Sequence, residues 1–221
     1  MKKTIFITLI LSLFFIGCAN KPNIYDYSAF LESKPKSILV VMPTNESIDI
    51  KASAAMLANA TMPLAEAGYY VFPVALVNDT FKFNGVYEAN DIKNISLNKL
   101  ETIFGADSVL YINITKYGTN YAILNSQTVV ESEVKLVDLK TQRKIWDKKV
   151  SVSNNSNNGN GGLIEMLISA AIDQIANTLN DAAYDMSMVA SNTVFSTNCN
   201  NCILKGPRSP SYGQDKQLIQ D

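Results

Sequence analysis

The chain has 221 residues, 47% of them hydrophobic, and a formal net charge of −1. These values are typical of a globular protein and provide no basic field of the kind that binds nucleic acid. The sequence contains no histidine, which excludes Ser-His-Asp and Cys-His catalysis and most transition-metal sites. We therefore expect no bound metal and no cofactor.

The N-terminus resembles a secretion signal. Lys2 and Lys3 precede an apolar run over residues 4–16, which has the length of a signal-peptide core and is too short to span a bilayer. The run ends in Gly17-Cys18, which resembles the bacterial lipobox, in which the cysteine is acylated and becomes the new N-terminus. We predict a signal peptide over residues 1–17 and a lipid on Cys18.

Two details qualify this N-terminal prediction. Phe15 stands where the lipobox usually has leucine, so an ordinary secretory signal with an incidental cysteine is the alternative. Ala19 follows the cysteine, whereas an aspartate there would favour retention in the inner membrane. We therefore expect an outer-membrane protein. Its anchoring should be stable, because two or more acyl chains hold a protein firmly where one is marginal.

The first half of the mature chain alternates strands and helices. Residues 18–36 are polar and predict a tether, and the apolar run at 38–42 predicts a buried strand. A helix is expected next, with a break or kink near Met62 because Pro63 follows, and then a strand over 69–74. The apolar positions that indicate this helix are Ile50, Ala54, Leu57 and Ala58.

The second half predicts a meander. Residues 81–94 look irregular, and a short helix from Ser96 ends at Gly105. A strand over 108–115 precedes a strand-rich stretch over 121–139. A turn over 140–143 and a returning strand over 144–153 complete the hairpin.

The C-terminal part predicts a long helix followed by a tail. An apolar stripe predicts one continuous helix from about Leu163 that packs on the sheet. Residues 37–196 would then form one α/β domain with a mixed β-sheet, and residues 197–221 an extended C-terminal tail. The stripe consists of Ile164, Ile168, Ala171, Ile175, Leu179, Ala182 and Met186.

Five stretches of the chain resemble a known family: residues 32–39, 60–73, 103–107, 136–139 and 206–213. Together they are similar to the lipoprotein family typified by a meningococcal genome-derived surface antigen. The resemblance implies an outer-membrane lipoprotein with a fold like the N-terminal domain of TolB. It also implies association with a lipoprotein that resembles the curli-secretion pore protein. It implies no enzymatic activity, and the only functional residue it carries over is Cys18.

Cys199 and Cys202 form a C-x-x-C pair. A redox role needs a thiol at a helix N-terminus, whereas this pair follows a helix. We therefore favour a structural disulfide, formed in an oxidising compartment and contributing only about 2 kcal/mol because its loop is small. A redox or metal site and a reduced pair are the alternatives, although two thiolates alone make a poor zinc site.

Other candidate sites are weaker. Scattered carboxylates are usually solvated surface, and residues 159–162 lack the lysine of a phosphate-binding loop. Three tyrosines, Tyr111, Tyr117 and Tyr121, could form a binding face; the alternative is that they belong to an ordinary half-buried surface of the sheet. The carboxylates are Asp79, Glu88, Asp91, Glu101 and Asp107.

These observations predict a non-enzymatic accessory or scaffold subunit of an envelope assembly, secretion or transport complex. An activator of a peptidoglycan synthase and a thiol-disulfide redox protein are the alternatives. Expected partners are the membrane, through the lipid, and an envelope protein, with a curli-secretion-like lipoprotein as one candidate; an oligomer remains open. The domain should face the periplasm, with exposure on the cell surface left open.

The predicted tail is our candidate docking segment. It contains Pro207, Arg208, Pro210 and Tyr212, and the prolines favour an extended form that loses less entropy on docking. Because the long helix is expected to complete the fold, we expect the segment from Gly206 onward to be dispensable for folding.

Overall fold

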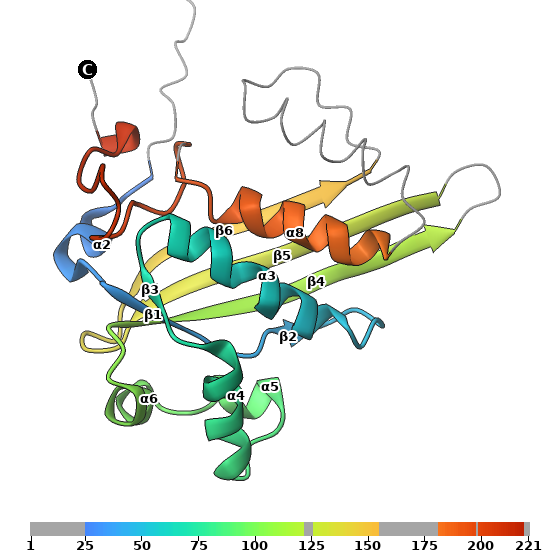
Figure 1. Cartoon of the computed structure of the whole chain (residues 1–221), viewed down its shortest axis with the longest axis horizontal. Coiled ribbons are helices and arrows are strands. Elements are labelled where there is room, and N and C mark those ends of the chain that lie inside the picture. Colours follow the sequence, from blue (N-terminus) through green and yellow to red (C-terminus); the bar gives the residue numbers. More distant parts are fainter. Residues whose placement is uncertain (1–24, 122–125, 155–180, 198, 219–221) are drawn as a thin grey trace, which may run out of the picture.

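A mixed β-sheet forms the centre of the protein (Figure 1). The computed structural model describes residues 25–121, 126–154, 181–197 and 199–218. The sheet has the order β3-β1-β4-β5-β6, and β2 pairs with β4 beyond the end of β1. β1 runs parallel to β3 and β4, whereas β4, β5 and β6 are antiparallel. The strands are β1 (Ser37–Val40), β2 (Thr44–Asn45), β3 (Tyr70–Val71), β4 (Ser108–Tyr121), β5 (Ser126–Asp138) and β6 (Lys144–Ser153).

Helices cover both faces of this sheet. On one face lie α3 (Ala52–Glu66) and α8 (Ala182–Val194), and on the other lie α4 (Val74–Phe83), α5 (Ala89–Lys93) and α6 (Leu97–Phe104) (Figure 1). Successive strand residues point to opposite faces, so β1 sends Ile38 and Val40 into the first core and Leu39 into the second. The mixed-sheet α/β fold predicted from the sequence is confirmed.

Helix α3 differs from its prediction in two ways. Of the predicted apolar positions only Leu57 is buried, since Ile50 precedes the helix and is 92% exposed and Ala54 and Ala58 are exposed. The buried positions are Ala52, Ala55, Met56, Leu57, Ala60, Pro63 and Leu64. The helix also continues through Pro63 to Glu66, so the break expected near Met62 is wrong. Proline removes a single backbone hydrogen bond there, and the burial of Leu64 in the next position holds the last turn in place.

Helix α4 was not predicted. The expected strand over 69–74 is reduced to the two residues of β3, and the helix begins directly after Pro73. Its buried side is made by Val77 and Phe81, four residues apart. By contrast, the short helix that ends at Gly105 and the hairpin between β5 and β6 lie where the sequence predicts them. Gly105 adopts φ +63°, which favours glycine.

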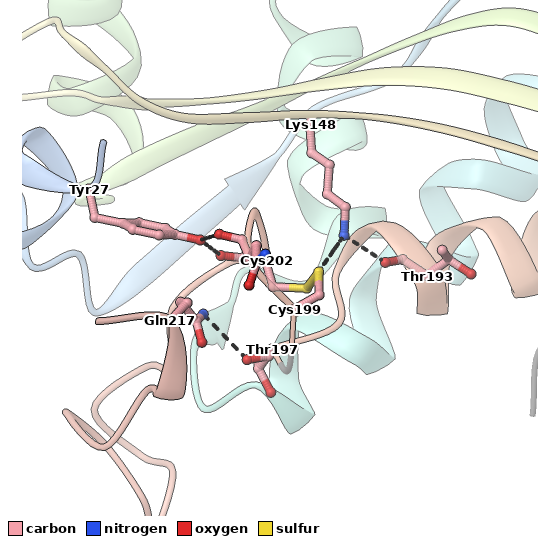
Figure 2. The surroundings of a disulfide bond; sticks show 8 residues. Tyr27, Lys148, Thr193, Thr197, Cys199, Cys202 and Gln217 are labelled. Carbon is pink, nitrogen blue, oxygen red and sulfur yellow. Dashed lines mark hydrogen bonds between the residues drawn. A yellow bond between two sulfur atoms is a disulfide. The ribbon is translucent and has the colours of Figure 1, made fainter. Parts of the chain in front are cut away.

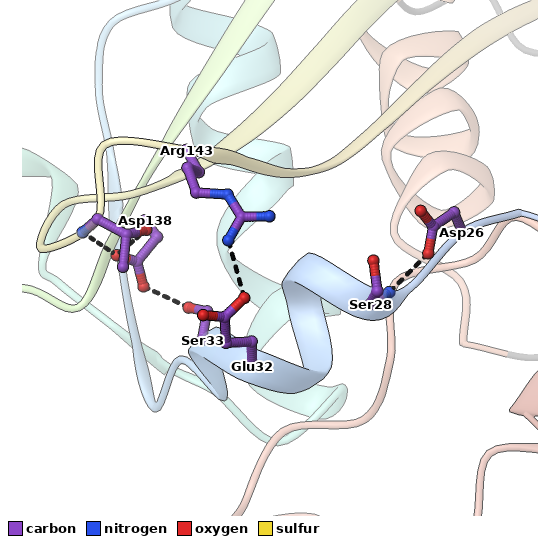
Figure 3. A network of polar contacts seen from close by, with 7 residues as sticks. Asp26, Ser28, Glu32, Ser33, Asp138 and Arg143 are labelled. Carbon is purple, nitrogen blue, oxygen red and sulfur yellow. Dashed lines mark hydrogen bonds and ion pairs between the residues drawn. The ribbon is translucent and has the colours of Figure 1, made fainter.

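Residues 25–36 belong to the folded domain, so the tether predicted over 18–36 is too long. Tyr27 and Phe30 are buried around α2 (Ser28–Ser33). Figure 3 shows how the end of α2 is attached to the turn after β5: Ser33 Oγ donates a hydrogen bond to the Asp138 carboxylate. The Arg143 guanidinium forms an ion pair of 2.8 Å with Glu32. The N-terminal segment is thereby fixed to the β5–β6 hairpin.

Asp138 is the buried centre of this attachment. Its Oδ1 accepts hydrogen bonds from the backbone N and the Oγ1 of Thr141, at 2.6 and 2.8 Å. Burial opposes ionisation, but the hydrogen bonds from Ser33 and Thr141 outweigh it and hold the pKa of Asp138 below its ordinary value. The carboxylate therefore stays charged and holds two segments of the chain together.

Helix α8 begins later than the predicted long helix. Asp181 has non-helical backbone angles and accepts a hydrogen bond from the backbone N of Tyr184, which makes it an N-cap. The predicted stripe is therefore interrupted between Leu179 and Ala182. Its earlier positions, from Ile164 to Leu179, lie outside the described residues. Within α8, Met186 packs in the core as expected.

Candidate binding loop and disulfide site

The segment after α8 packs back onto the domain. Cys202, Ile203 and Leu204 are buried. Two buried tyrosine hydroxyls donate to its backbone, Tyr27 to the Cys202 carbonyl at 2.6 Å and Tyr69 to the Leu204 carbonyl. The prediction of an extended tail from residue 197 is therefore wrong for this stretch, because its apolar residues fill the core between α2 and β3.

A close contact between two glycines fixes the next position. Gly206 N donates to the Ala67 carbonyl at 2.7 Å, and a Cβ on Gly206 would lie 2.5 Å from the oxygen of Gly68. Gly68 has φ +100° and is equally crowded, since a Cβ there would lie 2.5 Å from Ser209 N. Both positions require glycine, so the chain leaves the core at one defined point.

Beyond this contact the chain forms a closed loop over residues 205–215, which we call the C-terminal loop. Lys205 N donates to Oδ1 of the buried Asp215 at 3.0 Å and joins the two ends of the loop. Inside it, the backbone N of Ser209 donates to Gly206 and that of Tyr212 donates to Ser209. η1 (Lys216–Leu218) follows, and Leu218 packs against the main core. The expectation that everything from Gly206 onward is dispensable for folding does not agree with this packing.

The four residues predicted to bind a partner all lie on the C-terminal loop. Pro207, Arg208, Pro210 and Tyr212 are exposed. The Arg208 guanidinium lies 5.0 Å from the centre of the Tyr70 ring, within cation–π range, and its backbone N donates to Gly68. The structure thus brings these residues together on one ordered loop, and their role in binding stays a prediction.

Cys199 and Cys202 form a disulfide in the structure, and Lys148 reaches it from strand β6 (Figure 2). Lys148 Nζ lies 3.4 Å from Cys199 Sγ, 3.5 Å from Cys202 Sγ and 3.1 Å from the Thr193 carbonyl at the end of α8. Burial lowers the pKa of the Lys148 ammonium to about 8. The sequence analysis missed Lys148, although its alternation with Trp146 and Val150 places it on the covered face of the sheet.

The remaining candidates do not form a site. The Asp107 carboxylate accepts from Lys36 N, Ser37 N and Ser37 Oγ at 2.9 Å each, which is a structural role at the start of β1. A β-bulge after Ile114 puts Tyr111 and Tyr117 against opposite cores, so they share no binding face.

Some predicted residues lie outside the described part of the chain, and the predicted carboxylates within it do not cluster into a metal site. Cys18, residues 159–162 and the side chain of Tyr121 are outside the described part. In the described ranges, no three acidic or cysteine side chains are grouped so as to hold a metal ion. No helix in these ranges combines the length and apolar character needed to cross a bilayer.

The sequence matches a known lipoprotein family. Residues 25–208 match the family described as “Putative lipoprotein GNA1162-like”. The “Putative lipoprotein NMB1124/NMB1162” of Neisseria meningitidis serogroup B (strain ATCC BAA-335 / MC58) is 49% identical over 184 residues, which are 83% of this chain and 86% of that protein.

A solved structure from Neisseria meningitidis agrees with this match. The crystal structure of lipoprotein GNA1162 from Neisseria meningitidis is 51% identical with a TM-score of 0.55, and the match covers 65% of this chain and 100% of that one. A PelC dodecamer from Paraburkholderia phytofirmans is 11% identical with a TM-score of 0.44, over 74% and 88% of the two chains. The family resemblance found in the sequence is confirmed: this chain belongs to the GNA1162-like lipoproteins.

Proposed function

We propose that this lipoprotein is a non-enzymatic subunit of a cell-envelope complex that presents a protein-binding loop beside a membrane. In this proposal Cys18 carries the lipid, the outer membrane is the anchoring membrane, and the domain faces the periplasm. The C-terminal loop is the binding surface, through Pro207, Arg208, Pro210 and Tyr212.

The distance between anchor and domain supports the membrane-proximal part of the proposal. Cys18 is seven residues before Tyr25, the first described residue. A chain of that length spans at most roughly 25 Å when fully extended. The start of the described chain, α2 and the C-terminal segment lie at one end of the sheet (Figure 1). Tyr27 also contacts Cys202 directly. A lipid on Cys18 would therefore hold the C-terminal loop close to the membrane.

The closed shape of the C-terminal loop is the observation that carries the binding proposal. The contact between Lys205 and Asp215 and the packing of Gly206 on Gly68 hold the loop on the domain. A preformed loop loses little conformational entropy when it binds. Arginine and tyrosine, which Arg208 and Tyr212 supply at exposed positions, are enriched among the residues that dominate protein interfaces.

Crosslinking in cells tests this proposal. A variant with Pro207, Arg208, Pro210 and Tyr212 replaced by serine or alanine should fold, remain in the membrane fraction and lose its crosslinked partners. Substitution is preferable to deletion because Asp215 and Leu218 pack against the domain. An unchanged partner list would contradict the binding role of the loop.

Further outcomes separate the parts of the proposal. Cys18→Ser should release the protein from membranes, and continued anchoring would refute lipidation at Cys18. A peptidoglycan synthase among the partners would favour an activator, a curli-secretion-like lipoprotein would favour a secretion complex, and a second copy would indicate an oligomer. Turnover of a defined substrate by the purified protein would refute the non-enzymatic role.

A further inference from the structure

We propose that Cys199 and Cys202 form a thiol-disulfide exchange site in which the Lys148 ammonium stabilises the leaving thiolate. The inference does not depend on the function proposed for the C-terminal loop. It rests on the position of a cationic side chain against both sulfur atoms and on the unequal burial of the two cysteines.

The burial of the two cysteines gives the exchange a direction. Cys199 is partly exposed, whereas Cys202 has no exposed surface. We therefore assign the attack to Cys199 Sγ, on the more exposed residue of the pair, and take Cys202 Sγ as the leaving sulfur. Access to one sulfur is a main determinant of which bond forms in thiol-disulfide exchange.

The reaction balances with a dithiol reductant, such as a dithiol protein of the envelope. One thiolate of the reductant attacks Cys199 Sγ, a mixed disulfide forms, the Cys199–Cys202 bond breaks, and its electron pair remains on Cys202 Sγ. The second thiol of the reductant then attacks the mixed disulfide and releases Cys199. The reductant leaves as a disulfide, and the protein gains two electrons and two protons as two thiols.

Lys148 is placed to assist the first step. Its Nζ lies 3.5 Å from Cys202 Sγ, which becomes the thiolate. A cation at this distance lowers the pKa of a thiol, and a leaving thiol of lower pKa departs faster. The third contact of Nζ, to the Thr193 carbonyl, holds the ammonium in position at the C-terminal end of α8. Lys148 thus stabilises the leaving thiolate by direct contact with the reacting sulfur.

Reduction of the disulfide would also affect the N-terminal segment of the domain. Tyr27 OH contacts the carbonyl of Asn200 inside the disulfide loop at 3.1 Å, and that of Cys202 at its end. Opening the disulfide frees this turn from its crosslink, so the contact between Tyr27 and the turn should loosen. The redox state of the pair would thereby change how the start of the domain is held.

The test is the rate of disulfide reduction by dithiothreitol at neutral pH, measured on the full-length protein in detergent by alkylation and mass spectrometry. Lys148→Met should slow reduction about 3- to 10-fold, and Lys148→Arg should stay near the wild-type rate. Lys149→Met is the matched control, because Lys149 is the exposed neighbour on β6 and pairs with Glu133. Equal rates for Lys148→Met and wild type would overturn the proposal.

A second measurement keeps the proposal testable if Lys148→Met does not fold. The ultraviolet absorbance of the thiolate, followed against pH in the reduced wild-type protein and in a Cys199→Ser variant, reports the pKa of the Cys202 thiol without requiring a reagent to reach this buried residue. We expect the Cys202 thiol to titrate below the ordinary value of about 8.5. A value at or above 8.5 would show that Lys148 does not stabilise the thiolate, and would overturn the proposal.

Discussion

Two adjacent stretches of the C-terminal segment have opposite environments. In residues 202–206 every residue but the partly exposed Lys205 is buried, and the backbone is held by Tyr27, Tyr69 and Ala67. Residues 207–214 are mostly exposed on the C-terminal loop. Both stretches follow the last helix, yet one completes the core and the other is surface. We therefore expect stability to depend on the first stretch and the proposed binding on the second, with Gly206 as the boundary.

The largest effect is expected at the boundary itself. Gly206→Val should destabilise the protein by about 4 kcal/mol, because the new Cβ would overlap the backbone of Gly68. The two segments cannot move apart without unpacking Leu204. Urea unfolding followed by circular dichroism measures this. Pro207→Ala, one residue further on and exposed, is the control and should remain near wild type.

Truncation in the buried stretch comes next. Leu204→Ala should cost about 3 kcal/mol, since the side chain is buried in the main core and its removal leaves a cavity. The same unfolding measurement applies, with Pro210→Ala as the control in the exposed stretch. A loss below about 1 kcal/mol would mean that the segment does not contribute to the core.

The pH dependence of stability sharpens the account of the disulfide next to this stretch. Burial lowers the pKa of Lys148 from 10.5 to about 8, so between these values the unfolded state binds more protons than the folded state. Wild-type stability should therefore rise with pH across this window, relative to Lys148→Met, by about 3 kcal/mol. Unfolding curves of both proteins between pH 7 and 10.5 measure the difference. A constant difference would show that Lys148 is not desolvated.

The smallest effects on stability are expected in the exposed stretch. Arg208→Ala and Tyr212→Ala should each change the free energy of unfolding by less than about 0.5 kcal/mol. Arg208 makes a single cation–π contact with Tyr70, and Tyr212 is 47% exposed. Thermal unfolding checks this, and a loss comparable to that of Leu204→Ala would remove the distinction between the two stretches.

The sequence predicts the parts of the fold that carry strong local signals. The run at 38–42 is continuously apolar, the helix before Gly105 has an apolar side and a glycine stop, and the strand over 144–153 follows a clear turn. Helix α4 carries little such signal, because only Val77 and Phe81 of its ten residues are buried. The continuation of α3 through Pro63 depends on the burial of Leu64, which is a tertiary effect.

The candidate sites show the same limit. The loop residues Pro207, Arg208, Pro210 and Tyr212 are recognisable by type, but the closure of their loop depends on Gly68 and the buried Asp215. These contacts join residues that are far apart in the sequence or have no recognisable spacing, so no local sequence pattern predicts them. Lys148 lies 51 residues from Cys199, so only strand alternation, and not spacing, places it near the disulfide.

Site-specific photocrosslinking in cells tests whether the C-terminal loop binds a protein partner. A photoreactive amino acid is placed at Tyr212 on the C-terminal loop, and in a second protein at Lys82, an exposed position on α4 on the other face of the sheet. The account predicts that irradiation attaches a protein partner at position 212 and not at position 82. Partners captured at position 82 with none at position 212 would contradict it.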